Sequence, residues 1–554
     1  MRPDGRGELD SLYFDYPHFA PAVRPGGDEA VEVAIIGAGP VGLVAALTLA
    51  RHGVRCVVIE RKDTFNDGSR AICIARQSFH ILERLGAVQP FLDKSLGWTK
   101  GRSFFRGRQI LEFEMPHSAN EKFLPMYNLE QQYIEQFLWL AAQASPLIEI
   151  RWQSELFGVH DEDGAVRCDI RDPAGSYALH AGWLLAADGA RSAVRGLRGL
   201  ALHGENHEGR YVIADVQMKH DYPTIRRALF DPASNLGGTV LVHRQPDDIW
   251  RIDYQIESDE SAESATREQT VRAKVGAILA DIGHTGDWQL EWWSTYTANT
   301  LALDDYRDGR VFFVGDSAHI VPIFGVRGLN NGLADGENIG WKLAMVINGQ
   351  AGEGLLDSYS PERRGATMDV FANATRSTRF MTPPSHGWRM LRDAALSLSL
   401  SHAFARPFAN PRQMTPYTYR ESPLTRADTE PFEGGPAPGA VMANLALSDG
   451  GHLSDHLGTG FSVLVLDERP VDVARWQAAL APLDPTITVL AVDAGPDSRS
   501  LPIEGLRRLL GLGYGGVYLV RPDMHIAARW QRASPEQVAA CLAQLLDRDV
   551  EIGS

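Results

Sequence analysis

The stretch VEVAIIGAGPVGLVAALTLARHGVRCVVIE, residues 31–60, decides the fold of the first half of the chain. Its β-branched start predicts a strand, GAGP predicts a turn, and VGLVAALTLARHG predicts a helix that ends at Gly53. RCVVIE then predicts a second strand. Residues 33–50 carry no charge and are long enough for a membrane span, but the glycines and flanking strands favour a buried βαβ unit. The predicted fold class is α/β.

Three glycines in this stretch have the spacing Gly37-x-Gly39-x-x-Gly42, and Glu60 ends the second strand. In Rossmann-like domains the first glycine permits a tight turn, the second lets the backbone approach a pyrophosphate, and the third lets the helix pack on the sheet. The helix N-terminus stabilises the pyrophosphate, and the acidic residue accepts hydrogen bonds from a ribose. The pattern predicts a dinucleotide site without separating FAD from NAD; a glycine-rich turn without ligand is the alternative.

Two later segments place charged residues in loops after predicted strands. Arg70 lies in the triplet Ser69-Arg70-Ala71, beyond the second strand. WLLAADGARSAVR, residues 183–195, places Asp188 and Arg191 after an apolar strand. Alternative roles are a surface arginine for Arg70 and a strand-end turn residue for Asp188.

A third segment, RVFFVGDSAHIVPIFGVRGLNNG at 310–332, runs from a strand into Gly315 and Asp316. An aspartate at the carboxyl end of a strand lies where doubly wound sheets bind ligands. The glycines that follow open a helix whose N-terminus can hold a ring or an oxyanion near backbone N–H groups. His319 is interpreted as a structural, hydrogen-bonding histidine.

With these motifs, the chain resembles the single-component FAD-dependent aromatic hydroxylases, the family of 4-hydroxybenzoate hydroxylase and phenol hydroxylase. The helix motif Gln132-x-x-Glu135-x-x-Leu138 resembles the family helix whose glutamine reaches the flavin ribityl region. The resemblance spans residues 30–345 and rests on GAGPVGL at 37–43, Arg70, DGARS at 188–192 and GDSAHIVPIFGVRGLNNG at 315–332.

The resemblance implies that the dinucleotide is FAD and assigns its contacts. Glu60 would bind the adenosine ribose, and Arg70 and Gln132 the pyrophosphate and ribityl chain. Asp316 would bind the ribityl or pyrophosphate end, while Asp188 is associated in the family with both FAD and NAD(P)H. The full implied cofactor set is Gly37, Gly39, Pro40, Val41, Gly42, Glu60, Arg61, Arg70, Gln132, Asp188, Arg191, Gly315, Asp316, Pro322, Gly328, Leu329 and Asn330.

The flavin loop departs from the pattern of some family members. Those members have two prolines after GDxAH, whereas here Pro322 is followed by Ile323 and Phe324. The carbonyl of the second proline helps to orient the substrate in those members, so that role is not carried over. The wall facing the ring is expected to be more apolar.

Alternating segments in residues 196–300, YVIADVQMKH, GTVLVHR, IWRIDYQI and LEWWSTYT, predict a mostly antiparallel sheet with one buried face. In the resembled family such a sheet is inserted into the FAD domain and binds the aromatic substrate. Sheet packing is the alternative role for each candidate, and no catalytic residue is assigned. The candidate pocket residues are Tyr211, His220, His243, Tyr254, Trp293, Tyr296, Ile323 and Phe324.

The C-terminal stretch of the chain predicts a separate domain. Residues 426–441 are rich in Pro, Gly and acids, which is typical of a linker. Beyond them a βαβαββα order suggests a thioredoxin-like α/β domain, as in phenol hydroxylase relatives, and favours the longer phenol, 3-(3-hydroxyphenyl)propionate and polyketide hydroxylases. Its single cysteine, Cys541, does not support thiol–disulfide chemistry, so packing or homodimerisation is the expected role.

The sequence thus predicts eight segments. They are an N-terminal extension (1–29), a first FAD-binding segment (30–110), a mixed FAD and substrate segment (111–185), the DG motif (186–200), the substrate sheet (201–300), a second FAD-binding segment with closing helices (301–425), the linker (426–441) and the thioredoxin-like domain (442–554).

The composition of the chain argues against several classes of function. The net charge of −16 with no basic run argues against nucleic-acid binding. The four cysteines are scattered, which argues against a disulfide framework and a zinc site, and no metal-ligand spacing occurs. We expect a cytoplasmic protein without stable membrane insertion, since the N-terminus has no apolar signal region.

The resemblance implies a monooxygenase that hydroxylates a small phenolic compound with NADH or NADPH and O2, through a flavin C4a-hydroperoxide. Flavins carry the oxygen chemistry, and the protein positions the ring and excludes water. The alternatives are a Baeyer–Villiger or epoxidising oxygenase on a polyketide-like ring, and a flavin-binding module without turnover.

Overall fold

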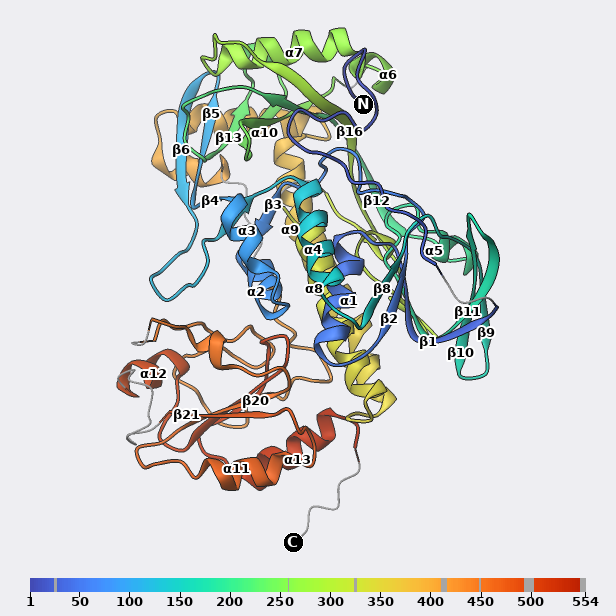
Figure 1. The fold of residues 1–554 in the computed structure, drawn as a ribbon. Coiled ribbons are helices and arrows are strands. Elements are labelled where there is room, and N and C mark those ends of the chain that lie inside the picture. The colour runs from blue at the N-terminus through green and yellow to red at the C-terminus, as the bar shows by residue number, and fades with distance from the viewer. Residues whose placement is uncertain are drawn as a thin grey trace.

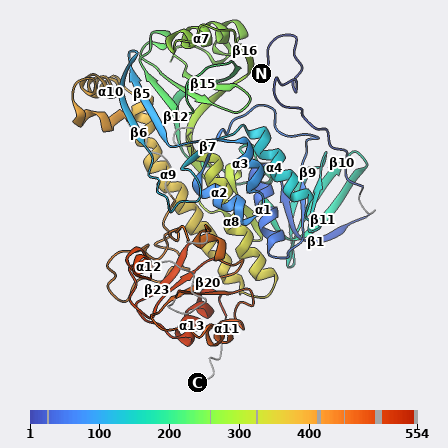
Figure 2. The same cartoon turned by 60° about the vertical axis from the view of Figure 1, so that its left-hand side comes forward.

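A computed structural model describes residues 1–23, 27–257, 259–322, 326–409, 416–447, 450–492 and 503–548. It contains two eight-stranded sheets, a small three-stranded sheet and a four-stranded sheet near the C-terminus. The second large sheet and helix α7 lie at one end of the molecule, the C-terminal unit lies at the other, and the first sheet lies between them (Figures 1 and 2).

The first sheet contains the predicted βαβ unit. β1, α1 and β2 follow one another, and β1 pairs in parallel with both β2 and β11. The order of the sheet is β17-β18-β11-β1-β2-β8, with β9 and β10 added beside β11. Its strands are β1 (Glu29–Ile36), β2 (Cys56–Ile59), β8 (Ile148–Arg151), β9 (Glu155–Glu162), β10 (Ala165–Asp172), β11 (Gly175–Ala186), β17 (Arg307–Asp308) and β18 (Val311–Phe313).

Helices α1 (Pro40–Arg51), α4 (Gln131–Gln143), α5 (Ala193–Leu197) and α8 (Gly328–Ile347) accompany this sheet. The charge-free helix α1 is buried over nine of its residues, which explains its apolar sequence without a membrane. It packs closely on α8, because a Cβ at Gly340 of α8 would approach the Thr48 side chain to 2.7 Å. Nearer the start of α8, a Cβ at Gly332 would approach the Val41 side chain to 2.7 Å, so the start of α8 lies beside the turn that precedes α1.

The second sheet has the order β19-β16-β12-β15-β14-β13-β5-β6. The four strands predicted in residues 196–300 are present as β12, β14, β15 and β16, and their mutual pairs are antiparallel. The sheet also takes β5 and β6 from residues 100–114, with β5 parallel to β13, so it extends beyond the range 201–300. Its strands are β5 (Lys100–Phe105), β6 (Arg108–Glu114), β12 (His203–Gln217), β13 (Arg226–Phe230), β14 (Thr239–Arg244), β15 (Ile249–Gln255), β16 (Gln289–Ala302) and β19 (His319–Ile320).

The second sheet has two different faces. Helix α7 (Glu268–Asp281) covers the outer face through a buried cluster that includes Val212, Ala214, Ile252 and Val275. The inner face faces the segment that leads into the small sheet, since Arg251 on it donates to the carbonyl of Ser69. The small sheet has the order β3-β7-β4 and lies with two short helices; these elements are β3 (Cys73–Ala75), α2 (Arg76–Arg84), α3 (Val88–Lys94), β4 (Leu96–Trp98) and β7 (Met126–Asn128).

The C-terminal unit has four strands in the order β21-β20-β22-β23. β20 is parallel to β21 and antiparallel to β22, and β22 is antiparallel to β23. The predicted βαβαββα order is present, with its three helices as α11, α12 and α13. The elements are β20 (Ser462–Leu466), α11 (Val473–Leu480), β21 (Thr488–Val492), α12 (Ile503–Leu510), β22 (Gly516–Val520), β23 (Ile526–Trp530) and α13 (Pro535–Leu545).

A buried ion-pair cluster joins this unit to the central helices. Glu362 of α9 accepts two hydrogen bonds from Arg521, at 2.6 and 2.9 Å, and one from Lys342 of α8 at 2.7 Å. Asp523 pairs with Arg521 at 2.6 Å. The remaining elements are α6 (Ala262–Ala265), α9 (Tyr359–Met381), α10 (His386–Ser399) and the 3-10 helices at Ala233–Asn235, Gly315–Ser317, Glu353–Ser358, Ala403–Ala409 and Leu453–His456.

Among the residues that the structure describes, no helix is both long and apolar enough to cross a membrane.

Candidate functional site

The predicted dinucleotide turn lies between β1 and α1, and its three glycines have different surroundings. Gly37 has φ +108°, and a Cβ there would clash with the carbonyl oxygen of Ala187. A Cβ at Gly42 would clash with the carbonyl oxygen of Gly37. Gly39 has no atom within 4 Å of an ideal Cβ position. Packing thus requires glycine at positions 37 and 42, whereas Gly39 faces open space where a ligand can approach the backbone.

Glu60 lies at the end of β2 and holds the turn from the other side. Its carboxylate accepts hydrogen bonds from the backbone N–H of Ala38 at 2.9 Å and of Lys62 at 3.0 Å. Arg61, beside it, is exposed. Pro40 is buried at the first position of α1, and Val41 lies against Gly315. The structure therefore brings Gly315 next to the glycine turn.

Two buried polar groups near this turn lack a partner among the described residues. Gln132 on α4 donates from Nε2 to the Tyr16 hydroxyl at 2.8 Å, but its Oε1 has no partner. Asp188 accepts from the backbone N–H of Val194 at 3.1 Å through Oδ2, but its Oδ1 has none. Unpaired buried polar atoms are costly, so they fit contacts to a bound polar molecule.

Asp316 follows β18 at the carboxyl end of the first sheet. Its side chain is accessible to water, yet the surrounding protein raises the pKa of its carboxyl by desolvation, while the charges of His319 and Arg70 lower it. Both properties hold for a side chain that faces water but is surrounded by protein at short range. Arg70 and Arg191 are themselves exposed.

The start of α8 is held by one side chain. Asn330 Oδ1 accepts from the backbone N–H of Ala75 at 2.8 Å and from Ser78 Oγ at 2.7 Å. Its Nδ2 donates to the carbonyls of Cys73 and Val326, at 3.1 and 2.7 Å. The Asn330 amide is thus fully used within the protein, and only the backbone at Gly328 and Leu329 is left to approach a ligand.

His319 is buried in a network below this loop, as expected of a structural histidine. Its Nε2 lies 2.7 Å from Asp335 Oδ2, and Arg363 donates to Asp335 Oδ1 at 2.6 Å. The same aspartate accepts from the backbone N–H of Gly315 at 3.0 Å. Pro322 is buried, while Ile323 and Phe324 lie outside the described residues.

The structure divides the predicted pocket residues between the two faces of the second sheet. Tyr211 and Tyr296 are directly opposite each other on the inner face, and His243 lies opposite Arg251 on the same face. The Tyr296 hydroxyl donates to the carbonyl of Val321 at 2.5 Å, which joins the sheet to the loop after Asp316.

The other three pocket candidates in the described residues lie on the outer face, so the structure does not bring them together with Tyr211, His243 and Tyr296. Tyr254 and Trp293 are buried in the cluster beneath α7, where the Trp293 indole donates to the carbonyl of Thr266 at 2.8 Å. His220 lies beyond β12, 3.1 Å from Arg227 and with its ring 5.3 Å from that of Trp250, also on the outer face. Aromatic side chains alternate between both faces, so residue type alone does not identify the inner one.

The inner face carries buried polar residues that the sequence patterns did not reveal. Arg226, His243, Gln245 and Asp253 each have at least one buried side-chain nitrogen or oxygen without a partner among the described residues. Burial raises the pKa of Asp253 to about 7, although Arg251 and Arg226 lower it. The alternation of β14 and β15 was visible in the sequence, but RRALF, which forms β13, has no alternating pattern.

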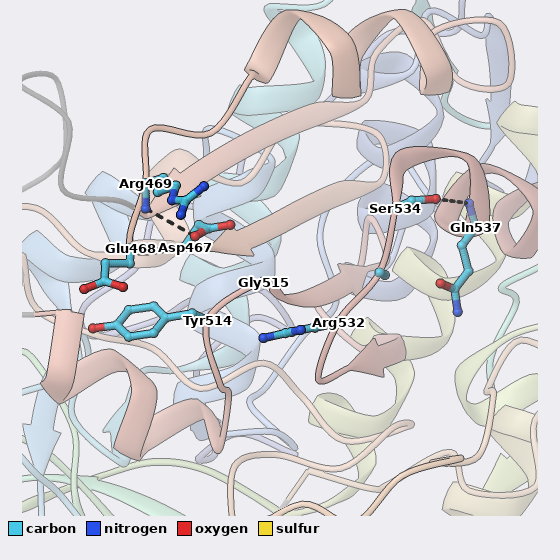
Figure 3. A pocket seen from close by; sticks show the side chains of 9 residues that line it. Asp467, Glu468, Arg469, Tyr514, Gly515, Arg532, Ser534 and Gln537 are labelled. Carbon is cyan, nitrogen blue, oxygen red and sulfur yellow. Dashed lines mark hydrogen bonds between the residues drawn. The ribbon is translucent and has the colours of Figure 1, made fainter.

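A surface pocket of about 580 Å³ lies elsewhere, on the C-terminal unit (Figure 3). In it Ser534 Oγ accepts from the backbone N–H of Gln537 at 3.3 Å, as a helix cap does. The pocket is open to solvent, and none of the residues predicted to bind the cofactor or the substrate lines it. It is lined by Asp467, Glu468, Arg469, Tyr514, Gly515, Arg532, Ala533, Ser534 and Gln537. No cluster of three or more potential metal ligands occurs among the described residues.

Comparisons with known proteins agree with this geometry. A 3-(3-hydroxy-phenyl)propionate/3-hydroxycinnamic acid hydroxylase of Mycolicibacterium smegmatis is 27% identical over 467 residues, which cover 81% of this chain and 80% of the relative. A protein of the same name from Klebsiella pneumoniae is 25% identical over 555 residues, covering 95% of this chain and 96% of the relative.

Solved structures show the same fold. The flavin-dependent monooxygenase PieE, in complex with FAD and substrate, matches with a TM-score of 0.80 at 23% identity, over 95% of this chain and 100% of that one. Aklavinone-11 hydroxylase, with FAD and aklavinone, matches with a TM-score of 0.77 at 24% identity, over 94% and 100%.

The family match covers the glycine turn, the second sheet and the start of α8 together. Residues 30–374 match the family described as FAD binding domain, and this segment is more than half of the chain. The chain therefore belongs to the FAD binding domain family.

Proposed function

We propose that this chain is an FAD-dependent aromatic hydroxylase that adds one oxygen atom from O2 to the ring of a phenolic compound, with NADH or NADPH as the electron donor. The observation that carries the proposal is the placement of the inner face opposite the end of β18. The hydroxyl of Tyr296 on that face donates a hydrogen bond to the carbonyl of Val321, five residues after Asp316. The negative charge of Asp316 also raises the pKa of that hydroxyl. A ring held on the inner face would therefore lie beside the loop that we assign to the flavin.

The FAD site that we propose runs from the glycine turn to the start of α8. Gly39 leaves room for the pyrophosphate to approach the backbone, and the unpaired Oε1 of Gln132 and Oδ1 of Asp188 supply acceptors for hydroxyl groups of the cofactor. Glu60 keeps the turn in place and would contact the adenosine ribose. Asp316 would bind the ribityl end. The residues fit the group, because Gly39 offers open space and Gln132 and Asp188 each offer an unused polar atom.

The remaining proposed contacts have weaker support from geometry. The exposed Arg61, Arg70 and Arg191 can reach phosphates or a nicotinamide cofactor only from the rim. Pro40, Val41, Gly315 and Pro322 would shape the site through packing, and Gly328, Leu329 and Asn330 would approach the ring through the backbone of α8.

FAD supplies the oxygen-activating chemistry when it is bound. The chain's own residues orient the ring, exclude water and keep the loop in place. Tyr296 and Asn330 fix Val321 and the start of α8 by hydrogen bonds, so the backbone N–H groups there are pre-organised. The apolar residues on and beside the inner face, including Ala228, Phe230 and Leu241, keep the space between sheet and loop dry.

We also propose the division of the chain into the eight segments given above, and a thioredoxin-like fold for its C-terminal segment. The order β21-β20-β22-β23, with one parallel and two antiparallel pairs, supports that fold. Cys541 is a single thiol whose pKa is raised by burial, so the unit would act in packing and not in thiol exchange.

The test is a visible spectrum of the purified protein followed by NADH and NADPH oxidation with a panel of phenols. The panel contains 3-(3-hydroxyphenyl)propionate, hydroxybenzoates, resorcinol and phenol. Bound flavin, oxidation stimulated by one phenol and a product heavier by one oxygen are the expected results. A flavin-loaded protein that consumes NAD(P)H without oxygenating any phenol, or that inserts oxygen into a ketone, would contradict the proposal.

A further inference from the structure

Arg226 is the first residue of β13 and is 3% exposed. Its Nε and Nη1 are buried without a hydrogen-bond partner, and no ion pair involves Arg226 among the described residues. An unpaired guanidinium away from water is strongly unfavourable, so proteins keep one mainly where a ligand supplies the missing charge.

The neighbouring arginines show what a purely structural arginine looks like here. Arg251 on the same face donates to both oxygens of Asp215, at 2.6 and 2.9 Å, and also to the carbonyl of Ser69. Arg227, next in the chain, points to the outer face, where its guanidinium lies over the Tyr222 ring at 3.1 Å from the centroid. Both have partners, whereas Arg226 does not.

The surroundings of Arg226 carry excess positive charge. Since Arg227 pairs with Val242, Arg226 lies beside His243, which in turn lies opposite Arg251. Burial and the two arginines lower the pKa of His243 well below its usual range, so this ring is neutral near pH 7. Asp215 already neutralises Arg251, and Asp253 acts on Arg226 electrostatically without an ion pair within 4 Å.

The positively charged surroundings of Arg226 lie close to the start of α8, which we assign to the flavin ring. Cys73 of β3 lies close enough to Arg226 and Asp253 for their charges to act on its thiol. The carbonyl of Cys73 accepts the hydrogen bond from Asn330 at the start of α8. One residue of the small sheet therefore separates Arg226 from the helix start that we assign to the flavin ring.

We propose that Arg226 binds a carboxylate of the aromatic substrate, so that the enzyme acts on a phenol that carries an acidic side chain. This inference rests on the proposed function and specifies its substrate class. The planar fork of guanidinium donors matches two carboxylate oxygens. The carboxylate neutralises the buried cation and anchors the far end of the molecule, and the ring is directed toward the loop after Asp316.

The experiment measures binding and not turnover, so that it is independent of the hydroxylation reaction. The flavin-loaded protein is titrated with 3-phenylpropionate and with 3-phenylpropionamide, which differ in charge but not in shape, and flavin absorbance reports binding. The wild type is expected to bind the acid at least about 30-fold more tightly than the amide. Equal binding of both, or binding of neither, would overturn the proposal.

Arg226→Met tests the residue itself. It should abolish the preference for the acid, and Arg226→Lys should restore some of it through its charge. Arg244→Met is the matched control, since Arg244 is a partly buried arginine beside Trp250 on the outer face, and it should keep the preference. A variant R226M that still prefers the acid would refute the assignment.

Thermal stability separates a binding role from a structural one. Because Arg226→Met removes an unpaired buried charge, the ligand-free variant should melt at the same temperature as the wild type or higher. A clear fall in melting temperature would show that Arg226 stabilises the fold through partners, and would contradict the proposal. Failure of the proposed function has a different signature, which is normal acid binding without oxygenation of any phenol.

Discussion

Asn330 Oδ1 accepts a hydrogen bond from the backbone N–H of Ala75 at 2.8 Å, which joins the start of α8 to β3 of the small sheet. The two residues are 255 positions apart in the chain. The contact sets the distance between the two elements that we place on either side of the flavin ring.

Asn330→Ala should lower both stability and flavin content. The change leaves the Ala75 N–H and the Ser78 hydroxyl without their acceptor, which costs about 1–3 kcal/mol per buried group. Urea unfolding and the flavin-to-protein absorbance ratio measure the two effects. Asn348→Ala, an exposed asparagine at the other end of α8 that donates to the carbonyl of His52, is the control and should behave as wild type.

Gly39→Ala should separate cofactor binding from folding. An added Cβ at Gly39 meets no atom within 4 Å, so the ligand-free protein should melt as the wild type does. The same Cβ would occupy the space assigned to the pyrophosphate, so FAD affinity should fall by at least about tenfold. Calorimetric titration of the apoprotein with FAD measures this.

Two further glycine variants serve as controls for the Gly39→Ala result. Gly42→Ala should reduce stability even without cofactor, because its Cβ clashes with the Gly37 carbonyl. Gly196→Ala, with nothing near its Cβ and outside the proposed site, should alter neither property. Unchanged FAD affinity in the Gly39→Ala variant would refute the placement of the pyrophosphate.

Arg521→Met should destabilise the protein strongly. Glu362 would keep Lys342, Asn338 and Ser422 as partners but lose both hydrogen bonds from Arg521, and Asp523 would lose its ion pair with Arg521. We therefore expect a loss of about 3–5 kcal/mol in the free energy of unfolding. Denaturant titration measures it. Arg475→Met breaks the exposed pair with Glu536 on the same unit and should change stability little; similar effects of the two variants would contradict the importance of the buried cluster.

The raised pKa of the buried Asp253 carboxyl should make the stability of the protein depend on pH. Burial raises its folded pKa to about 7, while the nearby charges of Arg226, Arg251 and Asp215 modify it. A raised carboxyl pKa contributes stability that is full below the unfolded value of about 3.9 and is lost as pH rises toward 7. The stability of the wild type relative to Asp253→Asn should therefore fall between about pH 4 and 7, by a few kcal/mol at most. Urea unfolding of both proteins across this range tests it, with the exposed Asp163→Asn as a flat control.

Local patterns predicted the elements of the fold that depend on neighbouring residues. The unit β1-α1-β2, the strands β12, β14, β15 and β16, and the elements of the C-terminal unit follow from periodicity and turn residues. The glycine turn was also predictable, because its chemistry is contained in six consecutive residues.

Long-range pairing explains what the sequence patterns did not reveal. β13 pairs in parallel with β5, although 120 residues separate them, and nothing in RRALF indicates that partner. Strand alternation predicts that two faces exist but not which one is covered by α7, so Tyr254 and Trp293 could not be separated from Tyr211 and Tyr296. From the sequence alone, Arg226 would be assigned to the surface, because its burial depends on the distant strand β5 that pairs with β13.

The strands of both large sheets come from interleaved stretches of the chain. In the first sheet, β11 lies between β1 and β18. The second sheet combines residues 100–114 with residues 203–302 and 319–320. During synthesis, the first sheet cannot be completed until the ribosome has passed residue 313, and the second sheet cannot be completed until it has passed residue 320. Each sheet keeps an open edge until its last strand has been made, so folding should be slow, highly cooperative and sensitive to chaperone supply. For the same reason, neither sheet can be excised as an independently folding fragment.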